Sequence, residues 1–369
     1  MEIPLSGPDI TDLEIQAVLN VLKTPYLSLG PKLPEFEKKI AEYAGVKHAV
    51  VVSSGTAALH LIVRSLGLGK ADEVITTPFS FIASANCLIY EKAKPVFVDI
   101  HPDTYNINVT KIEEKITDKT RAIIAVDVFG LMADWDALGR IAEKHDLFLI
   151  EDSCESLGAE YQARKAGSFG QAGCFAFYPN KQITTGEGGV IVTDDDQIAR
   201  LAKSMRNQGR DENAGWLQHQ RLGYNYRLSD INCALGIAQL KRIDEILAKR
   251  DKVAQMYNEK LKNMKDLKLP VDLPGSKRSW FVYVVHLTEK YSKMDRDSIL
   301  DKLRKAGIGC SDYFSPIHLQ PFYIELFGYK KGDFPVTEFT SERTIALPFF
   351  NNLSEKQIDY IVSALKKIL

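Results

Sequence analysis

The sequence predicts an α/β fold, in which a large domain with a mainly parallel seven-stranded sheet is followed by a smaller α+β C-terminal domain. Short apolar runs rich in Val and Ile alternate with helical patterns from about residue 48 to residue 250, as in layered α/β domains. The runs are apolar on both faces, like strands buried within a parallel sheet. The predicted strands cover residues 48–53, 73–77, 95–99, 122–127, 147–151, 174–178 and 189–193.

Helical periodicity and capping residues define the remaining elements. The expected N-caps are Ser229 for a long helix and Ser354 for the final amphipathic helix. An apolar strand at 280–287 marks a change of pattern after the alternating region. We therefore divide the chain into a large domain at 1–250, which includes the N-terminal segment, and a small α+β domain at 251–369. The other expected helices cover residues 57–66, 136–145, 229–250 and 296–306.

The composition argues against several classes of protein. The chain of 369 residues has a formal net charge of −1, so no basic surplus favours nucleic acid or an anionic membrane surface. The N-terminus does not resemble a secretory signal, and no apolar run approaches the roughly 20 residues that span a bilayer. The five cysteines are scattered and form no CxxC pair, which argues against a disulfide framework or metal site and for a cytoplasmic location.

Two acids stand at the carboxyl end of the strand predicted at 147–151. Glu151 and Asp152 come at its carboxyl end, and ligands of open parallel sheets bind beyond the carboxyl ends of the strands. An acid at that place can hold a positive charge on a ligand. A turn or a helix-capping aspartate would explain the same residue without any ligand.

A second feature lies where the strand predicted at 48–53 gives way to a helix. Ser54, Gly55 and Thr56 stand at this junction. Free backbone N–H groups and the helix dipole make a helix N-terminus a ready anion site, and Gly55 would let a phosphate approach the backbone. Without a ligand, the same residues describe an ordinary capped helix.

A third feature is the loop that carries Lys181. The segment CFAFYPNKQITTGEGGVIV leaves one strand, presents Lys181, and enters the next strand through a glycine-rich turn. A lysine in a loop is normally a solvated charge. A lysine between two strand ends, beside an anion site and an acid, is instead a candidate nucleophile.

Together the three features match what pyridoxal 5'-phosphate requires: a lysine for its aldehyde, a carboxylate for its ring nitrogen and a cradle for its phosphate. The segments SSGTAALHL, IEDSCESLGAEY, FYPNKQITTGEGG and RLGYNYRLSDINCALGIAQL resemble the DegT/DnrJ/EryC1/StrS family of sugar aminotransferases. The resemblance runs from Pro4 to the last helix. It implies the type I aminotransferase fold, and an enzyme that moves an amino group from an amino acid, expected to be L-glutamate, to a keto sugar carried on a nucleotide, for amino-sugar or polysaccharide biosynthesis.

The resemblance also implies a role for each matching residue. Lys181 would form the Schiff base and then serve as general base and acid, while Asp152 would keep the pyridine nitrogen protonated. Asn225, in GYNYR, would reach the phosphate of the neighbouring subunit, which implies a homodimer with shared active sites. The cofactor-binding residues implied are Ser54, Gly55, Thr56, Phe81, Asp152, Glu155, Lys181 and Asn225.

Two of these assignments have rivals within the sequence. Phe81 would stack on the cofactor ring, although Phe79 stands two residues away. His318 would lie close to the substrate with Tyr313 nearby, although His318 could simply pack between Pro316 and Pro321.

The chain departs from the family pattern at two positions. Many relatives carry a serine that helps to hold the phosphate where this chain has Ala176, so that contact is missing or another group supplies it. Relatives often carry Gln or His where this chain has Glu155, a variation associated with perosamine-type enzymes and with 3-dehydratases. A second carboxylate at the cofactor would favour a different sugar or an altered protonation pattern.

Three other functions compete with this interpretation. A pyridoxal-phosphate-dependent sugar 3-dehydratase resembles the family but has histidine in place of the lysine, so Lys181 argues against it. A non-catalytic sensor on the same fold tends to lose the lysine or the acid, and both are present. A lysine-dependent lyase without pyridoxal phosphate would leave Asp152 and the phosphate turn without a partner.

Overall fold

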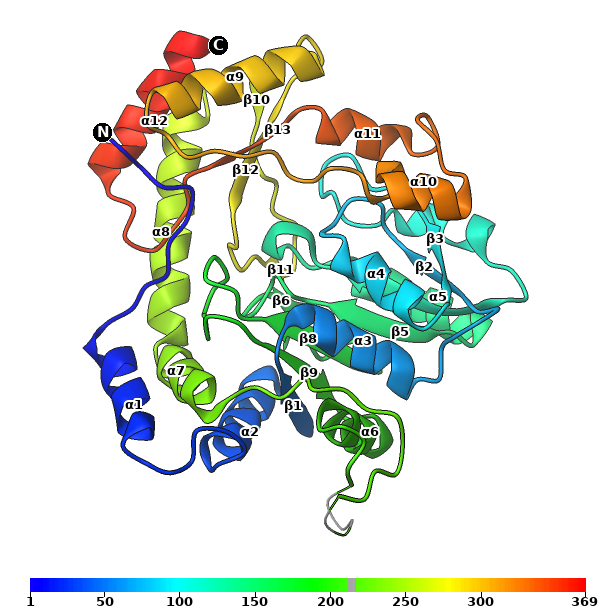
Figure 1. The fold of residues 1–369 in the computed structure, drawn as a ribbon. Coiled ribbons are helices and arrows are strands. Elements are labelled where there is room, and N and C mark those ends of the chain that lie inside the picture. The colour runs from blue at the N-terminus through cyan, green and yellow to red at the C-terminus, as the bar shows by residue number, and fades with distance from the viewer. Residues whose placement is uncertain (212–214, 216) are drawn as a thin grey trace.

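The computed structural model describes residues 1–211, 215 and 217–369, and its large domain is built on a seven-stranded sheet (Figure 1). Strand β9 is antiparallel to both neighbours, while the pairs β8–β5, β5–β4, β4–β2 and β2–β3 are parallel. The predicted strands are confirmed, each with ends within two residues of those expected. In spatial order the strands are β1 (His48–Val52), β9 (Gly189–Thr193), β8 (Ala172–Ala176), β5 (Phe148–Asp152), β4 (Thr120–Val126), β2 (Glu73–Thr76) and β3 (Lys94–Phe97).

Helices cover both faces of this sheet, which is why its strands are mostly apolar. One face packs against α2 (Lys32–Ala44), α5 (Trp135–His145) and α7 (Asp230–Lys241). The other face packs against α3 (Gly55–Ser65), α4 (Ala83–Tyr90) and α6 (Asp196–Arg206). The fold is therefore the layered α/β arrangement that the alternating pattern predicts.

The small domain has its own sheet and core. Strands β10 (Leu267–Lys268), β12 (Tyr283–Leu287) and β13 (Thr344–Leu347) form an antiparallel sheet, against which α9 (Lys293–Lys305) and α12 (Glu355–Ile368) pack. Ser354 caps α12 as predicted.

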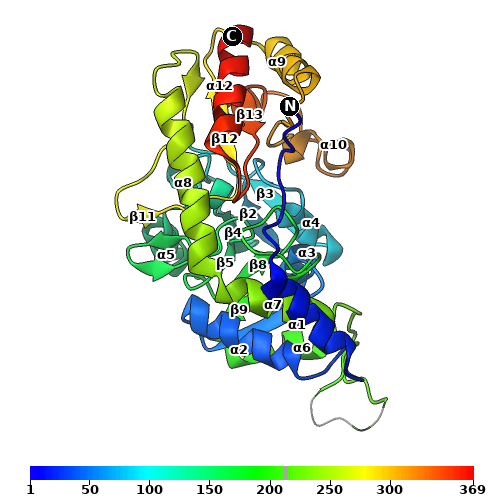
Figure 2. The ribbon, with the colours of Figure 1, turned by 90° about the vertical axis from the view of Figure 1, so that its left-hand side faces the viewer.

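The first residues of the chain also belong to this core. Ile3 is buried within it and pairs with Ile308, and Figure 2 shows the N-terminal segment running from the small domain down to α1 (Asp12–Leu22). The prediction that groups this segment with the large domain therefore describes α1 better than the residues before it. α1 packs on α7 of the large domain.

The prediction of one helix over 229–250 is wrong in its continuity and its end. Ser229 caps α7 as expected, but the backbone of Arg242 (φ −103°, ψ 11°) leaves the helical range. A second helix, α8 (Ile243–Leu261), follows at once. No proline or glycine lies at the break, so the hydrophobic periodicity predicts one continuous helix. Because Ile246 of α8 packs in the large core and Tyr257 in the small core, α8 joins the two domains.

Several elements have weaker signals in the sequence. A second three-stranded sheet joins β11 (Ser276–Lys277), β6 (Glu160–Tyr161) and β7 (Arg164–Lys165). Two short helices, α10 (Pro321–Phe327) and α11 (Pro335–Ser341), each begin at a proline. Among the described residues, no helix combines the length and apolarity needed to cross a membrane. The short 3-10 helices are Val109–Lys111, Glu113–Lys115, Val128–Gly130 and Ile317–Leu319.

Candidate active site

A cavity of about 530 Å³ lies at the carboxyl ends of β4, β5 and β8 and at the N-terminus of α3. Because β1, β4, β5 and β8 run in the same direction, the loops that follow them meet at one edge of the sheet. Phe281, Tyr313 and Phe314 close the cavity from the C-terminal part of the chain. Of the predicted site residues, those that line the cavity are Ser54, Gly55, Thr56, Phe81, Asp152, Glu155, Lys181 and Tyr313, and those that do not are Asn225 and His318.

The N-terminus of α3 forms one end of the cavity. The Ser54 hydroxyl accepts a hydrogen bond from the N–H of Ala57 at 3.1 Å, which caps the helix. Gly55 and Thr56 open the helix, where backbone N–H groups lack intrahelical acceptors. A Cβ added to Gly55 would lie 2.8 Å from Cβ of Ala176 and 2.9 Å from Sγ of Cys154, so only glycine fits there without a shift. Backbone therefore faces the cavity at this end, as an anion cradle requires.

Asp152 supplies a buried carboxylate at the floor of the cavity. It is the last residue of β5 and only 4% exposed. Oδ2 accepts a hydrogen bond from the Ser84 hydroxyl at 2.6 Å, and Oδ1 accepts one from the N–H of Cys154 at 3.3 Å. Cys174 Sγ lies 3.8 Å from Oδ1. Within the described part of the chain no Lys, Arg or His pairs with this carboxylate, although burying an unpaired charge is costly.

The preceding acid has a different environment, because neighbouring residues of a strand point to opposite faces. Glu151 is fully buried and accepts hydrogen bonds from the N–H groups of Gly167 and Phe169. It does not line the cavity. Of the two acids at the end of β5, Asp152 alone is placed to meet a ligand in the cavity.

Lys181 projects into the cavity from the loop between β8 and β9. Its side chain is 13% exposed, and Nζ lies 3.8 Å from Oε1 of Glu155. Nζ also lies 3.9 Å from the centroid of the Phe281 ring, where a cation is attracted to the face of the aromatic system. The N–H of Lys181 donates to the carbonyl of Tyr178 at 2.9 Å, which turns the loop sharply after β8. The amine is thus enclosed by one carboxylate and one ring.

Glu155, which stands where relatives often carry Gln or His, faces Lys181 directly. Oε2 accepts a hydrogen bond from the N–H of Phe129 at 2.9 Å. Burial raises the pKa of this carboxyl, while the positive charge of Lys181 acts in the opposite direction. The second carboxylate of the site is therefore a neighbour of the amine.

The two candidate phenylalanines lie in different places. Phe81 is 62% exposed and lines the cavity. Phe79 is fully buried and packs at about a right angle against Phe129 and Phe314, with ring centroids 6.0 and 5.5 Å away. The structure places Phe81 at the cavity and Phe79 in the core; the stacking of Phe81 on a ring remains a prediction.

The two candidate substrate residues also separate. Tyr313 lines the cavity, and burial raises the pKa of its hydroxyl to about 12. His318 is fully buried outside the cavity, with Nε2 3.1 Å from Oε1 of Glu338 and its ring 4.7 Å from that of Phe334. Burial lowers the pKa of His318. A direct contact between His318 and a ligand in this cavity has no support in the geometry.

Asn225 is exposed, and its segment is firmly held. Its backbone forms a bridge with Asn207, and the rings of Tyr224 and Tyr226 stack with centroids 4.9 Å apart on either side of it. Because Asn225 is exposed and lies outside its own chain's cavity, contact with a second subunit remains open to it.

Sequence reasoning missed several residues of the cavity. Ser84 lies one turn after Phe81 and therefore reaches the same cavity, a spacing that could have revealed it. Phe281 and Phe314 had no such signal, because they approach from the small domain. Donor atoms of Asp152, Cys154 and Cys174 also lie within 4.8 Å of one another, as ligands of a metal can. Burial raises the pKa of Cys174 well above its usual value, which disfavours the thiolate that binds metals.

The fold first defines the class of protein, because solved aminotransferases share it along the whole chain. The structure of PseC from Helicobacter pylori, an aminotransferase involved in the biosynthesis of pseudoaminic acid, superimposes with a TM-score of 0.95 at 33% identity, covering 100% of this chain and 99% of PseC. Spr1654 from Streptococcus pneumoniae, solved in its PMP-form, gives a TM-score of 0.95 at 28% identity over 100% and 98% of the two chains.

The sequence then defines the family. The chain belongs to the DegT/DnrJ/EryC1/StrS aminotransferase family, which matches residues 8–366. It is 39% identical over 370 residues to the GDP-perosamine synthase of Caulobacter vibrioides, covering 100% of this chain and 98% of that relative. The resemblance drawn from the four motifs is confirmed, and the protein is an enzyme of a sugar aminotransferase family.

Proposed function

We propose that this enzyme uses pyridoxal 5'-phosphate to move an amino group from L-glutamate to a keto sugar linked to a nucleotide, in amino-sugar or polysaccharide biosynthesis. The observation that carries the proposal is Asp152, a buried carboxylate that faces the cavity without a cationic partner in the described chain. A protonated pyridine nitrogen is the kind of group that would balance this charge.

The residues around the cavity fit the cofactor at each of its reactive groups. Ser54, Gly55 and Thr56 would hold the phosphate at the N-terminus of α3, and Asp152 would hold the ring nitrogen. Lys181 would bind the aldehyde carbon from the opposite loop. When bound, pyridoxal phosphate supplies a reactive aldehyde and a protonated ring that withdraws electrons from the carbon attached to the amino nitrogen.

Lys181 would then move the protons of the reaction. Once the amino donor displaces it, the free amine can take a proton from the donor carbon and later return one. Glu155, 3.8 Å from Nζ, and the ring of Phe281, 3.9 Å away, restrict where that amine can lie. The enclosure also limits the access of water to the amine, because the whole side chain of Lys181 is only 13% exposed.

A nucleotide-linked substrate has two lines of support. The relative from Caulobacter vibrioides is named for a GDP-linked sugar, and the cavity is about 530 Å³, which leaves room for a sugar beside the cofactor. Tyr313 would meet the sugar with its hydroxyl from the small domain, and the exposed ring of Phe81 would cover the cofactor. His318 is proposed only as support behind this wall, through the hydrogen bond that joins its ring to Glu338.

A homodimer with shared active sites follows from the same proposal. Large apolar side chains are exposed along the N-terminal segment, including Leu19, Leu22 and Tyr26, which are 40%, 52% and 58% exposed. A second copy of the chain would cover them and would bring its own Asn225 toward the phosphate. The cytoplasmic location rests on the scattered cysteines alone.

The direct test is optical. The purified protein with pyridoxal phosphate should show a visible absorbance band that shifts when glutamate is added. A panel of keto-sugar nucleotides should then restore the original band, and the sugar that does so most rapidly identifies the acceptor. A protein that binds no pyridoxal phosphate, or whose band no amino acid changes, would overturn the proposal in favour of a sensor. Loss of a hydroxyl from the sugar without transfer of nitrogen would indicate the dehydratase instead.

A further inference from the structure

The guanidinium of Arg250 is buried behind the wall of the cavity. Arg250 lies on α8, is 3% exposed, and donates to backbone oxygens rather than to a carboxylate. Nε donates to the carbonyl of Trp280 at 2.7 Å, and Nη2 donates to that of Phe281 at 2.8 Å. Burial lowers the pKa of Arg250 to about 10, so the protein bears a cost to keep this charge in place.

Arg250 contacts the residue before Lys181 and the residue whose ring lies against Nζ of Lys181. Nη2 also lies 3.4 Å from the carbonyl oxygen of Asn180, the residue immediately before Lys181. Phe281, whose carbonyl Arg250 holds, presents its ring to Nζ of Lys181 at 3.9 Å. One guanidinium therefore contacts both the backbone that carries the amine and the residue against which the amine packs.

A second side chain strengthens the same connection from the other side of the lysine. Gln182 donates through Nε2 to the carbonyl of Ser279 at 3.1 Å and to the carbonyl of Glu155. The loop at 180–182 is thus joined to the segment at 279–281 on both sides of Lys181. Neither Arg250 nor Gln182 lines the cavity, so their influence passes through the backbone.

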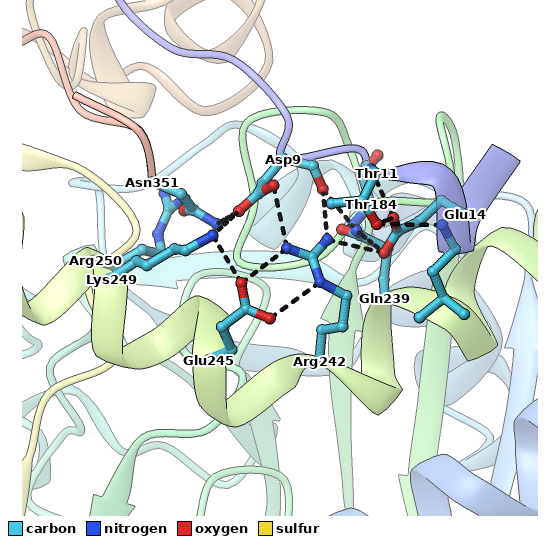
Figure 3. Close-up of polar contacts among 11 residues, drawn as sticks. Asp9, Thr11, Glu14, Thr184, Gln239, Arg242, Glu245, Lys249, Arg250 and Asn351 are labelled. Atoms are coloured by element: carbon cyan, nitrogen blue, oxygen red, sulfur yellow. Dashed lines mark hydrogen bonds and ion pairs between the residues drawn. The ribbon is translucent and has the colours of Figure 1, made fainter. Parts of the chain in front are cut away.

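The positive charge of Arg250 is connected to the carboxylate of Asp9 through the side chain of Asn351 (Figure 3). Nη1 of Arg250 donates to Oδ1 of Asn351 at 2.8 Å, and Nδ2 of Asn351 donates to Oδ2 of Asp9 at 3.1 Å. Asp9 also pairs with Lys249 and Arg242, at 3.1 and 3.2 Å. The N-terminal segment, the chain near residue 351 and α8 thereby form one polar network.

We propose that Arg250 is a positioning residue that holds the amine of Lys181 against Phe281 and next to Glu155. The role requires the guanidinium fork, because a single ammonium cannot reach the Trp280, Phe281 and Asn351 oxygens with the same geometry. The consequence for catalysis rests on the proposed function, in which Lys181 binds the cofactor. Misplacing a reacting group by about 1 Å can cost about 100-fold in rate.

The test compares Arg250→Lys and Arg250→Met with Arg242→Lys. Arg242 is a matched control, since it also binds Asp9 but contacts neither the 180–182 loop nor the 279–281 segment in the described structure. In the protein without added cofactor, an acylating reagent labels lysines, and peptide mass spectrometry gives the rate at Lys181 relative to Lys38, whose side chain is 78% exposed. Thermal unfolding and half-saturation by pyridoxal phosphate are measured on the same samples.

We expect both Arg250 variants to raise the relative labelling of Lys181, because an amine released from Phe281 becomes accessible. Half-saturation by pyridoxal phosphate should move to about 10-fold higher concentration or more, as a small displacement of a reacting group implies. Arg242→Lys should leave both quantities within about 2-fold of the wild type, even if it lowers the unfolding temperature as much.

Unchanged labelling of Lys181 in both Arg250 variants would overturn the inference, as would an equal change in Arg242→Lys, which would indicate general loosening. If Arg250→Met fails to fold, Arg250→Lys and Asn351→Ala supply the same measurement. Labelling needs no cofactor, so it separates this inference from the proposed function. A wild-type protein that takes up no pyridoxal phosphate would refute that function and leave the labelling result to decide the role of Arg250.

Discussion

Replacing Asp152 by asparagine tests the charge at the floor of the cavity. The substitution keeps the size of the side chain, and one oxygen remains to accept the hydrogen bond that Ser84 donates at 2.6 Å. The contacts at the end of β5 therefore survive in large part. What is lost is the negative charge, which we propose holds the pyridine nitrogen of the cofactor in its protonated form.

The structure sets the magnitude of this loss. Asp152 is 4% exposed, so little solvent screens its interaction with a ligand in the cavity. Hydrogen bonds to charged groups contribute about 1.5–3 kcal/mol. Because Asp152 is so deeply buried, we expect a loss at the upper end of this range, on the order of 3 kcal/mol of transition-state stabilisation. That loss corresponds to a rate reduced roughly 100-fold or more.

The assay is the half reaction with glutamate under conditions in which the variant is saturated with cofactor. The change in visible absorbance gives the rate of a single turnover, and thermal unfolding confirms the fold. Ser84→Ala is the control, because it removes one hydroxyl donor but keeps the charge, and it should reduce the rate less than Asp152→Asn does. If Asp152→Asn binds the cofactor and keeps most of the wild-type rate, Asp152 is only a structural residue at a strand end.

Four further substitutions test other parts of the site and the fold. Lys181→Ala should abolish turnover without unfolding the protein, and borohydride reduction of the native enzyme should attach the cofactor to residue 181; a label on another lysine contradicts this. Ala176→Ser should restore a phosphate contact and lower the cofactor concentration for half-saturation about 5-fold, or about 1 kcal/mol, in a titration of the cofactor-free protein. Mixing inactive Lys181→Ala and Asn225→Ala subunits should regain activity after confirmed subunit exchange, since one site of a mixed dimer carries neither lesion; no gain would mean that Asn225 acts within its own chain or not at all. Burial lowers the pKa of His286 to about 4 from 6.5, so its contribution to the free energy of unfolding is present above pH 6.5 and is lost as the pH falls toward 4, up to about 3 kcal/mol. In urea unfolding, His286→Gln should therefore lose less stability than the wild type over that pH range. An identical loss in the two proteins would refute this cause.

The sheet could be predicted because buried parallel strands carry a local signal. Each of the seven strands is mostly apolar, and burial on both faces by helices favours that pattern. The break at Arg242 gives no such signal, because neither residue beside it is a proline or a glycine. Arg242 binds Asp9 and Glu14 at the break, and contacts across more than 200 positions of sequence leave no trace in local periodicity.

The residues of the site also divide into those that the sequence could predict and those that it could not. Gly55, Asp152 and Lys181 lie at or just beyond the carboxyl ends of strands, so the topology of a parallel sheet brings them together once the strands are known. Phe281 reaches the cavity only because α8 fixes the small domain against the large one. His318 shows the limit of a role implied by resemblance alone: the resemblance places it close to the substrate, yet it is fully buried beside Glu338 and does not line the cavity.

The small domain therefore surrounds the amine of Lys181 as well as forming part of the cavity wall. Lys181 belongs to a loop of the large domain, but the ring against which its amine packs belongs to the chain that leads into β12. Any motion of the small domain that carried Phe281 away would release the amine toward solvent and toward Glu155 alone. Because Arg250 binds the backbone on both sides of that contact, the position of the amine and the docking of the two domains depend on the same side chain.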